Sequence, residues 1–138
     1  NLIENQENKS ISNIFLEQGE IYFRKLEHEV FNSILETTES FVLSLGGGTP
    51  CYYNNHLLLK RKDVMSIYLK SSVPFLMEKL KIKKTKRPLI KDLTDDELEN
   101  YIAKHLFDRS YYYHKAMHFI EVDNKTKKQI VDEIYKLI

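Results

Sequence analysis

Residues 41–48 read FVLSLGGG, a short apolar segment that ends directly in three glycines. A continuous apolar run of this length is typical of a parallel strand that is buried on both faces. Open α/β sheets bind ligands at the carboxyl ends of their strands. Because Gly46, Gly47 and Gly48 carry no side chains, their backbone N–H groups can approach a polar ligand closely. The segment therefore predicts an α/β fold with a ligand site at its glycines.

Two further apolar runs, residues 64–69 (VMSIYL) and 119–122 (FIEV), are the other strand candidates. Around them, apolar residues recur at steps of three and four, which is the helical period. The segments predicted to be helical are residues 1–18, 20–36, 54–62 (helix or turn), 72–80, a stretch launched by residues 94–97, and 126–138. Strands that alternate with helices predict a three-layer α/β/α domain around a parallel sheet.

Signals at the helix ends support this assignment. Ser10 is a candidate N-cap and Gly19 a natural helix stop. Residues 94–97 read TDDE, a capping box with acidic residues in the first turn. Residues 79–91 hold seven basic residues and no acidic one, which indicates an exposed loop.

Length and composition exclude several classes of protein. A chain of 138 residues fits one domain, residues 1–138, and 42% apolar with 30% charged residues excludes a disordered tail. The net charge of +1 gives no general reason to expect a nucleic-acid partner, although the basic run keeps that alternative open. No apolar run is long enough to cross a membrane. The single Cys51 fits a reducing, cytoplasmic compartment.

Arginine is scarce, since only four of the 21 basic residues are arginines. Arg24 and Glu27 are three residues apart on a predicted helix, so the carboxylate can fix a guanidinium that grips a ligand carboxylate. Arg87 lies in the basic stretch, where it can swing over a nucleotide. Arg109, near the end of a predicted helix, offers a second guanidinium group with its planar set of N–H donors.

Four segments together resemble the shikimate kinase family of P-loop kinases. They are residues 14–27 (IFLEQGEIYFRKLE), 42–48 (VLSLGGG), 87–90 (RPLI), and Arg109 with the downstream Tyr112, Tyr113 and Ala116. The resemblance covers essentially the whole chain. It implies a five-stranded parallel sheet in the order 2-3-1-4-5, in which residues 41–45, 64–69 and 119–122 supply three strands, and a lid at about residues 79–93.

The resemblance also implies a role for each candidate residue. Arg24 and Arg109 hold the carboxylate of shikimate, and the glycines contact its hydroxyl side, with Gly47 the principal contact. Arg87 reaches ATP, and Lys79 takes a position where many relatives carry an arginine that stacks on adenine. The remaining residues expected to wall the substrate pocket are Phe15, Phe23, Glu27, Pro88 and Leu89.

The implied reaction is the ATP-dependent phosphorylation of the 3-hydroxyl of shikimate to shikimate 3-phosphate, with Mg²⁺, in a monomer. Its partners are the small molecules shikimate and ATP, with no nucleic acid and no membrane. Two alternatives stay open at this point. One is a non-catalytic binding module, for shikimate or, through the basic loop, for nucleic acid; the other is a related kinase acting on a substrate such as gluconate.

The chain departs from the family pattern at its start. No G-x-x-x-x-G-K-[ST] motif occurs in it. The second Asp of the family's D-x-D would fall immediately before Asn1. We therefore expect the family's first two strands to be missing, no catalytic residue to lie within these residues, and the 138 residues alone to be unstable and inactive. Whether Tyr112 or Tyr113 matches the family tyrosine stays open.

Overall fold

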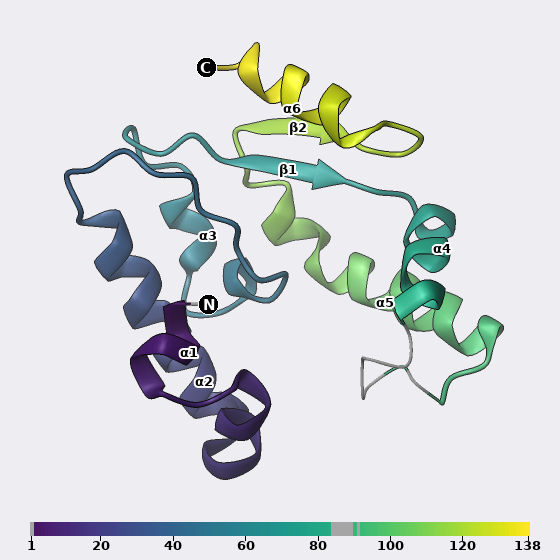
Figure 1. The fold of residues 1–138 in the computed structure, drawn as a ribbon, viewed down its shortest axis with the longest axis horizontal. Coiled ribbons are helices and arrows are strands. Elements are labelled where there is room, and N and C mark those ends of the chain that lie inside the picture. Colours follow the sequence, from purple (N-terminus) through teal and green to yellow (C-terminus); the bar gives the residue numbers. More distant parts are fainter. Residues whose placement is uncertain (1, 84–89, 91) are drawn as a thin grey trace. The chain divides into compact units, whose positions relative to one another are not determined.

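The structure is a computed structural model that describes residues 2–83, 90 and 92–138. The chain divides into two compact units, Asn1–Leu58 and Leu59–Ile138, which Figure 1 shows as ribbons. Each unit has its own cluster of buried apolar side chains. The elements of the first unit are α1 (Leu2–Glu7), α2 (Ile11–Leu35), the 3-10 helix η1 (Thr49–Cys51) and α3 (Asn55–Leu58).

The segment predicted as the first helix is interrupted once, at Asn8. Asn8 adopts a left-handed backbone conformation (φ 51°) that ends α1, so a single helix over residues 1–18 is wrong. Ser10 then caps α2 as predicted, because its hydroxyl accepts a hydrogen bond from the backbone N–H of Asn13 at 3.2 Å. Gly19 breaks the helical geometry inside α2, at φ 82° and ψ 173°, which confirms the predicted stop.

Gly19 is needed for its backbone conformation and not for space. A Cβ atom at this position would meet no atom within 4 Å, yet its φ and ψ lie in a region that is essentially restricted to glycine. We expect Gly19→Ala to lower the free energy of unfolding by about 1–3 kcal/mol, measured by urea denaturation. Gln18→Ala, at the exposed neighbouring position, is the control. Equal stability of the two variants would contradict the assigned conformation.

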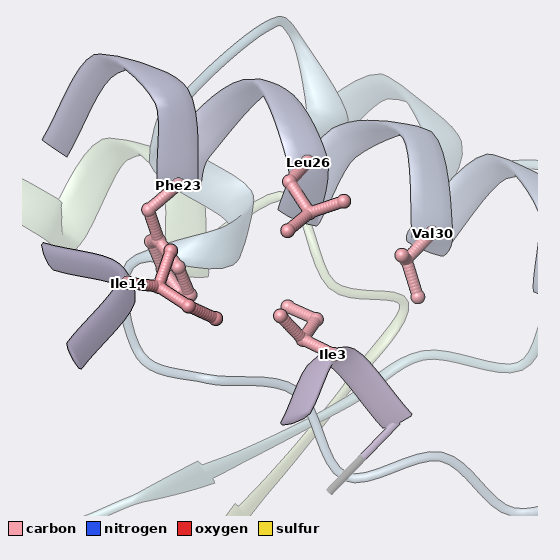
Figure 2. Packing of buried hydrophobic residues seen from close by; sticks show 5 residues of the cluster. All are labelled: Ile3, Ile14, Phe23, Leu26 and Val30. Atoms are coloured by element: carbon pink, nitrogen blue, oxygen red, sulfur yellow. The ribbon is translucent and has the colours of Figure 1, made fainter. Parts of the chain in front are cut away.

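The core of the first unit is built by one stripe of α2. Phe23, Leu26 and Val30 point from this helix toward Ile14 and Ile3, as Figure 2 shows. These side chains are at most 9% exposed, and their spacing of three and four residues is the one that the sequence predicts. Because these side chains are packed in the core, the neighbouring face of α2, which carries Arg24 and Glu27, has a fixed position.

The predicted strand at residues 41–45 is wrong. The described residues form one sheet of two strands, and this segment is not part of it. Val42 is 99% exposed and Phe41 46% exposed. A strand exists only where a neighbour pairs with its backbone groups, and the described part of the chain supplies none here. The apolar composition was therefore sufficient to predict a strand but not to form one.

The second unit contains the parallel pair. Strands β1 (Ile67–Lys70) and β2 (His118–Glu121) run parallel, with Ile67 opposite His118. This confirms the pairing direction of the second and third strand candidates, although β1 begins at Ile67 and not at residue 64. The helices of this unit are α4 (Val73–Lys83), α5 (Asp95–Tyr113) and α6 (Lys127–Tyr135). Helices α4 and α5 together form the crossover that a parallel connection requires (Figure 1).

Helices α4 and α5 pack on each other through an apolar cluster centred on Ile90, Leu98 and Ile102. Thr94 and Glu97 form both hydrogen bonds of the predicted capping box at the start of α5. The predicted exposed loop over residues 79–91 is wrong at both of its ends. Residues 79–83 continue α4, and Ile90 is only 3% exposed, because apolar side chains at each end join the cluster.

The described elements therefore make a mostly helical α/β chain with one two-stranded parallel sheet. Residues 84–89 and 91, which include Arg87, Pro88 and Leu89 of the predicted lid, lie outside the described residues. Among the residues that the structure describes, no helix combines the length and the apolar character needed to cross a membrane.

Candidate functional site

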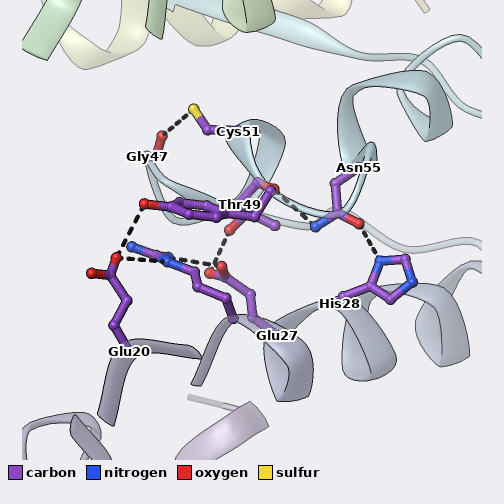
Figure 3. A network of polar contacts seen from close by, with 9 residues as sticks. Glu20, Glu27, His28, Gly47, Thr49, Cys51 and Asn55 are labelled. Atoms are coloured by element: carbon purple, nitrogen blue, oxygen red, sulfur yellow. Dashed lines mark hydrogen bonds and ion pairs between the residues drawn. The ribbon is translucent and has the colours of Figure 1, made fainter. Parts of the chain in front are cut away.

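Arg24 and Glu27 form a shielded ion pair on α2. The Nη1 atom of Arg24 donates a hydrogen bond to Oε2 of Glu27 at 2.9 Å, and the two side chains are 13% and 10% exposed. The Nε atom of Arg24 donates to Oε1 of Glu20 at 3.3 Å. Figure 3 shows both glutamates reaching from the same helix. The predicted link between Arg24 and Glu27 is thus present.

Aromatic rings surround the guanidinium of Arg24. Its central carbon lies 4.4 Å from the ring centroid of Tyr52, 5.2 Å from Phe23 and 6.0 Å from Phe15. The hydroxyl of Tyr52 donates to the same Glu20 oxygen at 3.1 Å. Cation–π contacts of this kind add to the ion pair and fix the plane of the guanidinium. The predicted residues Phe15, Phe23, Arg24 and Glu27 are therefore brought together.

The charge of this guanidinium is permanent. Burial alone would lower the pKa of Arg24, but the hydrogen bond and the negative charge of Glu27 outweigh burial and raise the pKa above its usual value. A guanidinium that stays protonated at all working pH values is a constant partner for an anion.

The glycine run lies against this pair. A Cβ atom on Gly48 would stand 2.7 Å from Nη1 and 2.8 Å from Nη2 of Arg24. A Cβ atom on Gly46 would stand 3.3 Å from Oε1 of Glu27. Gly48 has an ordinary helical backbone conformation (φ −85°), so glycine is needed there for space. The carbonyl of Gly47 accepts a weak hydrogen bond from Sγ of Cys51 at 3.9 Å.

Four polar residues of this region, Thr49, Asn55, His28 and Glu20, were not predicted as site residues from the sequence. Thr49, Asn55 and His28 connect the glycine turn to α2 through side-chain hydrogen bonds. Thr49 follows the glycines directly, and Glu20 stands four residues before Arg24, so both had a signal in the sequence. No pattern pointed to Asn55, because its partners are 6 and 27 residues away along the chain.

The other predicted site residues lie in the second unit or outside the described residues. Arg109 is a partly exposed residue of α5, and its side chain makes no hydrogen bond or ion pair with any other residue that the structure describes. The ammonium of Lys79, on α4, lies 5.1 Å from the ring centroid of Phe75. Arg87, Pro88 and Leu89 are among the residues that are not described.

The chemistry of the first unit suits a small carboxylate. A guanidinium has five N–H donors, and the hydrogen bonds of Arg24 to Glu20 and Glu27 use one donor each on Nε and Nη1. Its Nη2 atom donates to no other residue in the described part of the chain, and it lies beside a glycine with no side chain to block it. A carboxylate placed there can accept a charge-assisted hydrogen bond from a fixed, permanently charged donor. Fold and site thus define an α/β protein suited to binding a small anionic molecule.

Comparisons with known proteins identify the family. A model of the family described as shikimate kinase matches residues 1–138. The shikimate kinase of Flavobacterium psychrophilum is 53% identical over 137 residues, which cover 99% of this chain and 80% of that protein. The shikimate kinase of Flavobacterium johnsoniae is 52% identical and is covered over 79% of its length. The chain belongs to the shikimate kinase family of P-loop kinases.

Solved structures agree with this identification. The crystal structure of shikimate kinase from Bacteroides thetaiotaomicron matches with a TM-score of 0.86 at 31% identity, and the match covers 99% of this chain and 77% of that one. The shikimate kinase from Acinetobacter baumannii in complex with shikimate matches with a TM-score of 0.82 at 26% identity, over 99% and 73% of the two chains. The fold is therefore that of a shikimate kinase.

Proposed function

We propose that this protein transfers the γ-phosphoryl group of ATP to the 3-hydroxyl of shikimate, which gives shikimate 3-phosphate and ADP. The observation that supports it best is the guanidinium of Arg24, which is held by Glu27 and Glu20 and keeps its Nη2 donor beside Gly48. Shikimate carries one carboxylate, which fits this donor. The family membership supports the same substrate.

In this proposal Arg24 orients the substrate and does not take part in the bond changes. The attacking hydroxyl releases its proton to the solvent, the new P–O bond forms and the bond between the γ-phosphorus and the ADP oxygen breaks, so the acceptor must be held in line with the phosphoryl group. Arg24 fixes the acceptor at its carboxylate. Phe15, Phe23 and Glu27 are proposed to wall the substrate pocket, and the backbone of Gly47 to contact the hydroxyl side of the substrate. Pro88 and Leu89, which the family resemblance also assigns to the pocket, lie outside the described residues.

The nucleotide side of the proposal rests on fewer contacts. Lys79 and Arg87 are proposed to face ATP, and Lys79 keeps its ammonium near the Phe75 ring on α4. Among residues 2–83, 90 and 92–138, no cluster of three or more His, Cys, Asp or Glu side chains is arranged to hold a metal ion. These residues do not fit a Mg²⁺ site, so we assign none of them to the Mg²⁺ that accompanies ATP in this family.

We also propose that residues 1–138 belong to a single kinase domain that acts as a cytoplasmic monomer on small molecules. The proposal includes no nucleic-acid or membrane partner. The chain's near-neutral charge and its single Cys51 support this part of the proposal.

A product assay tests the proposed reaction. The full-length protein is incubated with MgATP and shikimate, and shikimate 3-phosphate and ADP are quantified by chromatography with mass detection. We expect the two products in equal amounts. Gluconate in place of shikimate is expected to give no phosphorylated product. Binding of shikimate without product would favour the non-catalytic module, and preferred phosphorylation of gluconate would favour the related kinase.

Arg109 is proposed to supply the second fork for the carboxylate. We expect Arg109→Ala to raise the KM for shikimate about tenfold, which is the effect of losing one charge-assisted hydrogen bond, and to leave the KM for ATP unchanged. Lys104→Ala, an exposed position on the same helix, is the control. If Arg109→Ala changes the KM for ATP and leaves that for shikimate unaltered, the assignment to the carboxylate is wrong.

A further inference from the structure

A closed ring of hydrogen bonds connects α2 to the turn that follows the glycines. The ring runs from Glu27 to Thr49, on to Asn55, and back to α2 through His28 (Figure 3). Arg24, Glu27 and His28 are spaced by three and four residues, so they share one face of the helix. The ring uses Oε1 of Glu27, whereas the ion pair with Arg24 uses Oε2.

The hydrogen bond from Thr49 occupies one carboxylate oxygen of Glu27 and leaves the other oxygen to accept from Arg24. The hydroxyl of Thr49 donates to Oε1 of Glu27 at 2.6 Å, while Oε2 accepts from Arg24. Thr49 is 2% exposed and Glu27 is 8% exposed, so no water competes strongly for either oxygen. Without the hydroxyl, the carboxylate of Glu27 has one fixed partner in place of two and can rotate about its terminal bond.

Asn55 holds Thr49 in place from the other side. Asn55 is completely buried, and its Nδ2 atom donates to the backbone carbonyl of Thr49 at 2.9 Å. Its Oδ1 atom lies 2.6 Å from Nδ1 of His28. Both ends of a buried amide are thus used, which is the condition under which a buried polar group orders its surroundings.

The turn between Thr49 and Asn55 is strained. Tyr53 (φ 50°) and Asn54 (φ 58°) both adopt left-handed backbone conformations, which are unfavourable for a bulky residue such as tyrosine. The ring of Tyr53 stacks on that of His28, with centroids 5.3 Å apart and planes 24° apart. Strained backbone persists where surrounding contacts over-determine it, and such sites cluster where a ligand is bound.

We propose that Thr49, Asn55 and His28 are positioning residues for the substrate carboxylate, acting through Glu27 on the guanidinium of Arg24. This inference rests on the proposed function, since it assumes that Arg24 binds shikimate. The ring fixes Glu27, Glu27 fixes Nη1, and the plane of the guanidinium then sets the direction of the unused Nη2 donor.

The first test compares two substitutions at Thr49 in the full-length protein. Thr49→Val keeps the shape of the side chain and removes the hydroxyl, whereas Thr49→Ser keeps the hydroxyl. We expect Thr49→Val to raise the KM for shikimate about tenfold, the usual effect of one lost hydrogen bond to a charged group. Its kcat and its KM for ATP are expected to stay within about twofold, and Thr49→Ser is expected to restore the wild-type KM for shikimate.

The second test separates positioning from general stability. Asn55→Ala removes a buried hydrogen bond to a backbone carbonyl, and Ser66→Ala does the same in the other unit, where Ser66 donates to the carbonyl of Leu59 at 2.7 Å. We expect both variants to melt at a lower temperature. Only Asn55→Ala is expected to raise the KM for shikimate, by about tenfold.

The outcomes distinguish this inference from the proposed function. If the wild-type protein neither binds nor phosphorylates shikimate, the proposed function fails. If the wild type is active and Thr49→Val matches Thr49→Ser in its KM for shikimate, the positioning role is wrong. An equal effect of Asn55→Ala and Ser66→Ala on that KM would also overturn it.

Discussion

Replacing Arg24 with alanine is expected to weaken the binding of shikimate by about 100-fold or more. The physical reason is that the change removes a permanently charged donor whose orientation is already set by Glu27 and Glu20. A charge-assisted hydrogen bond from a fixed guanidinium contributes about 1.5–3 kcal/mol, so losing this bond together with the positive charge amounts to about two powers of ten. The affinity is measured by calorimetric titration of the full-length protein with shikimate.

The same substitution also affects stability, and this effect must be separated from binding. Glu27 is 8% exposed, and removing Arg24 leaves its carboxylate buried beside one hydroxyl. Leaving one partner of a buried ion pair unpaired costs about 3–5 kcal/mol. The double substitution Arg24→Met with Glu27→Gln removes both charges, so it is expected to recover most of the lost stability without recovering shikimate binding.

Two further variants act as controls for Arg24. Arg24→Lys keeps the charge but loses the planar fork, so we expect it to bind more weakly than the wild type and more tightly than Arg24→Ala. Lys25→Ala removes the neighbouring basic residue, which is exposed and forms a surface pair with Glu29 at 3.8 Å. It is expected to change neither affinity nor stability. Equal shikimate affinity of Arg24→Ala and Lys25→Ala would rule out the carboxylate site.

Gly48→Ala is expected to weaken shikimate binding by about 10-fold to 100-fold while the protein stays folded. The added Cβ atom would stand 2.7–2.9 Å from three atoms of the Arg24 guanidinium. A contact that short forces the guanidinium to move, and it is pinned by Glu27 and Glu20. Displacing a binding group by about 1 Å can reduce function by two orders of magnitude. Because the backbone of Gly48 is relaxed at φ −85°, alanine adds little backbone strain.

Gly19→Ala is the matched control for Gly48→Ala. At Gly19 the cost of alanine is backbone strain with no steric contact, whereas at Gly48 it is a steric contact with no backbone strain. We therefore expect Gly19→Ala to lower stability without changing the affinity for shikimate, and Gly48→Ala to do the reverse. The two variants are compared by urea denaturation and by calorimetric titration. A Gly48→Ala protein with wild-type affinity would show that Arg24 does not bind from its observed position.

The starts of α2 and α5 and the break at Gly19 could be predicted from the sequence because their signals are local. Ser10 and Thr94 cap helices with their own hydroxyls, and Gly19 breaks α2 through its own backbone. The link between Arg24 and Glu27 was also predictable, because residues three apart on a helix lie on one face. In each case the partners are separated by a few residues at most.

The predicted strand at residues 41–45 failed for the opposite reason. Pairing of a strand depends on a neighbour that is distant in sequence, and apolar composition does not supply one. The strands predicted at residues 64–69 and 119–122 are confirmed because these two segments pair with each other, with Ile67 opposite His118. The loop predicted at residues 79–91 was wrong for a different reason. Its many charges favoured an exposed loop, although residues 79–83 continue α4 and Ile90 is buried.

The sequence by itself determined the family, the starts of α2 and α5 and the ion pair between Arg24 and Glu27, since these depend on residues that are close together or on a motif in fixed order. Only the tertiary structure decided that Gly48 must lack a side chain to make room for Arg24, and that Thr49, Asn55 and His28 close a ring behind Glu27. The physical reason is that Arg24 with Gly48, Glu27 with Thr49 and His28 with Asn55 are pairs of residues 22 to 27 positions apart along the chain, and folding alone brings them into contact.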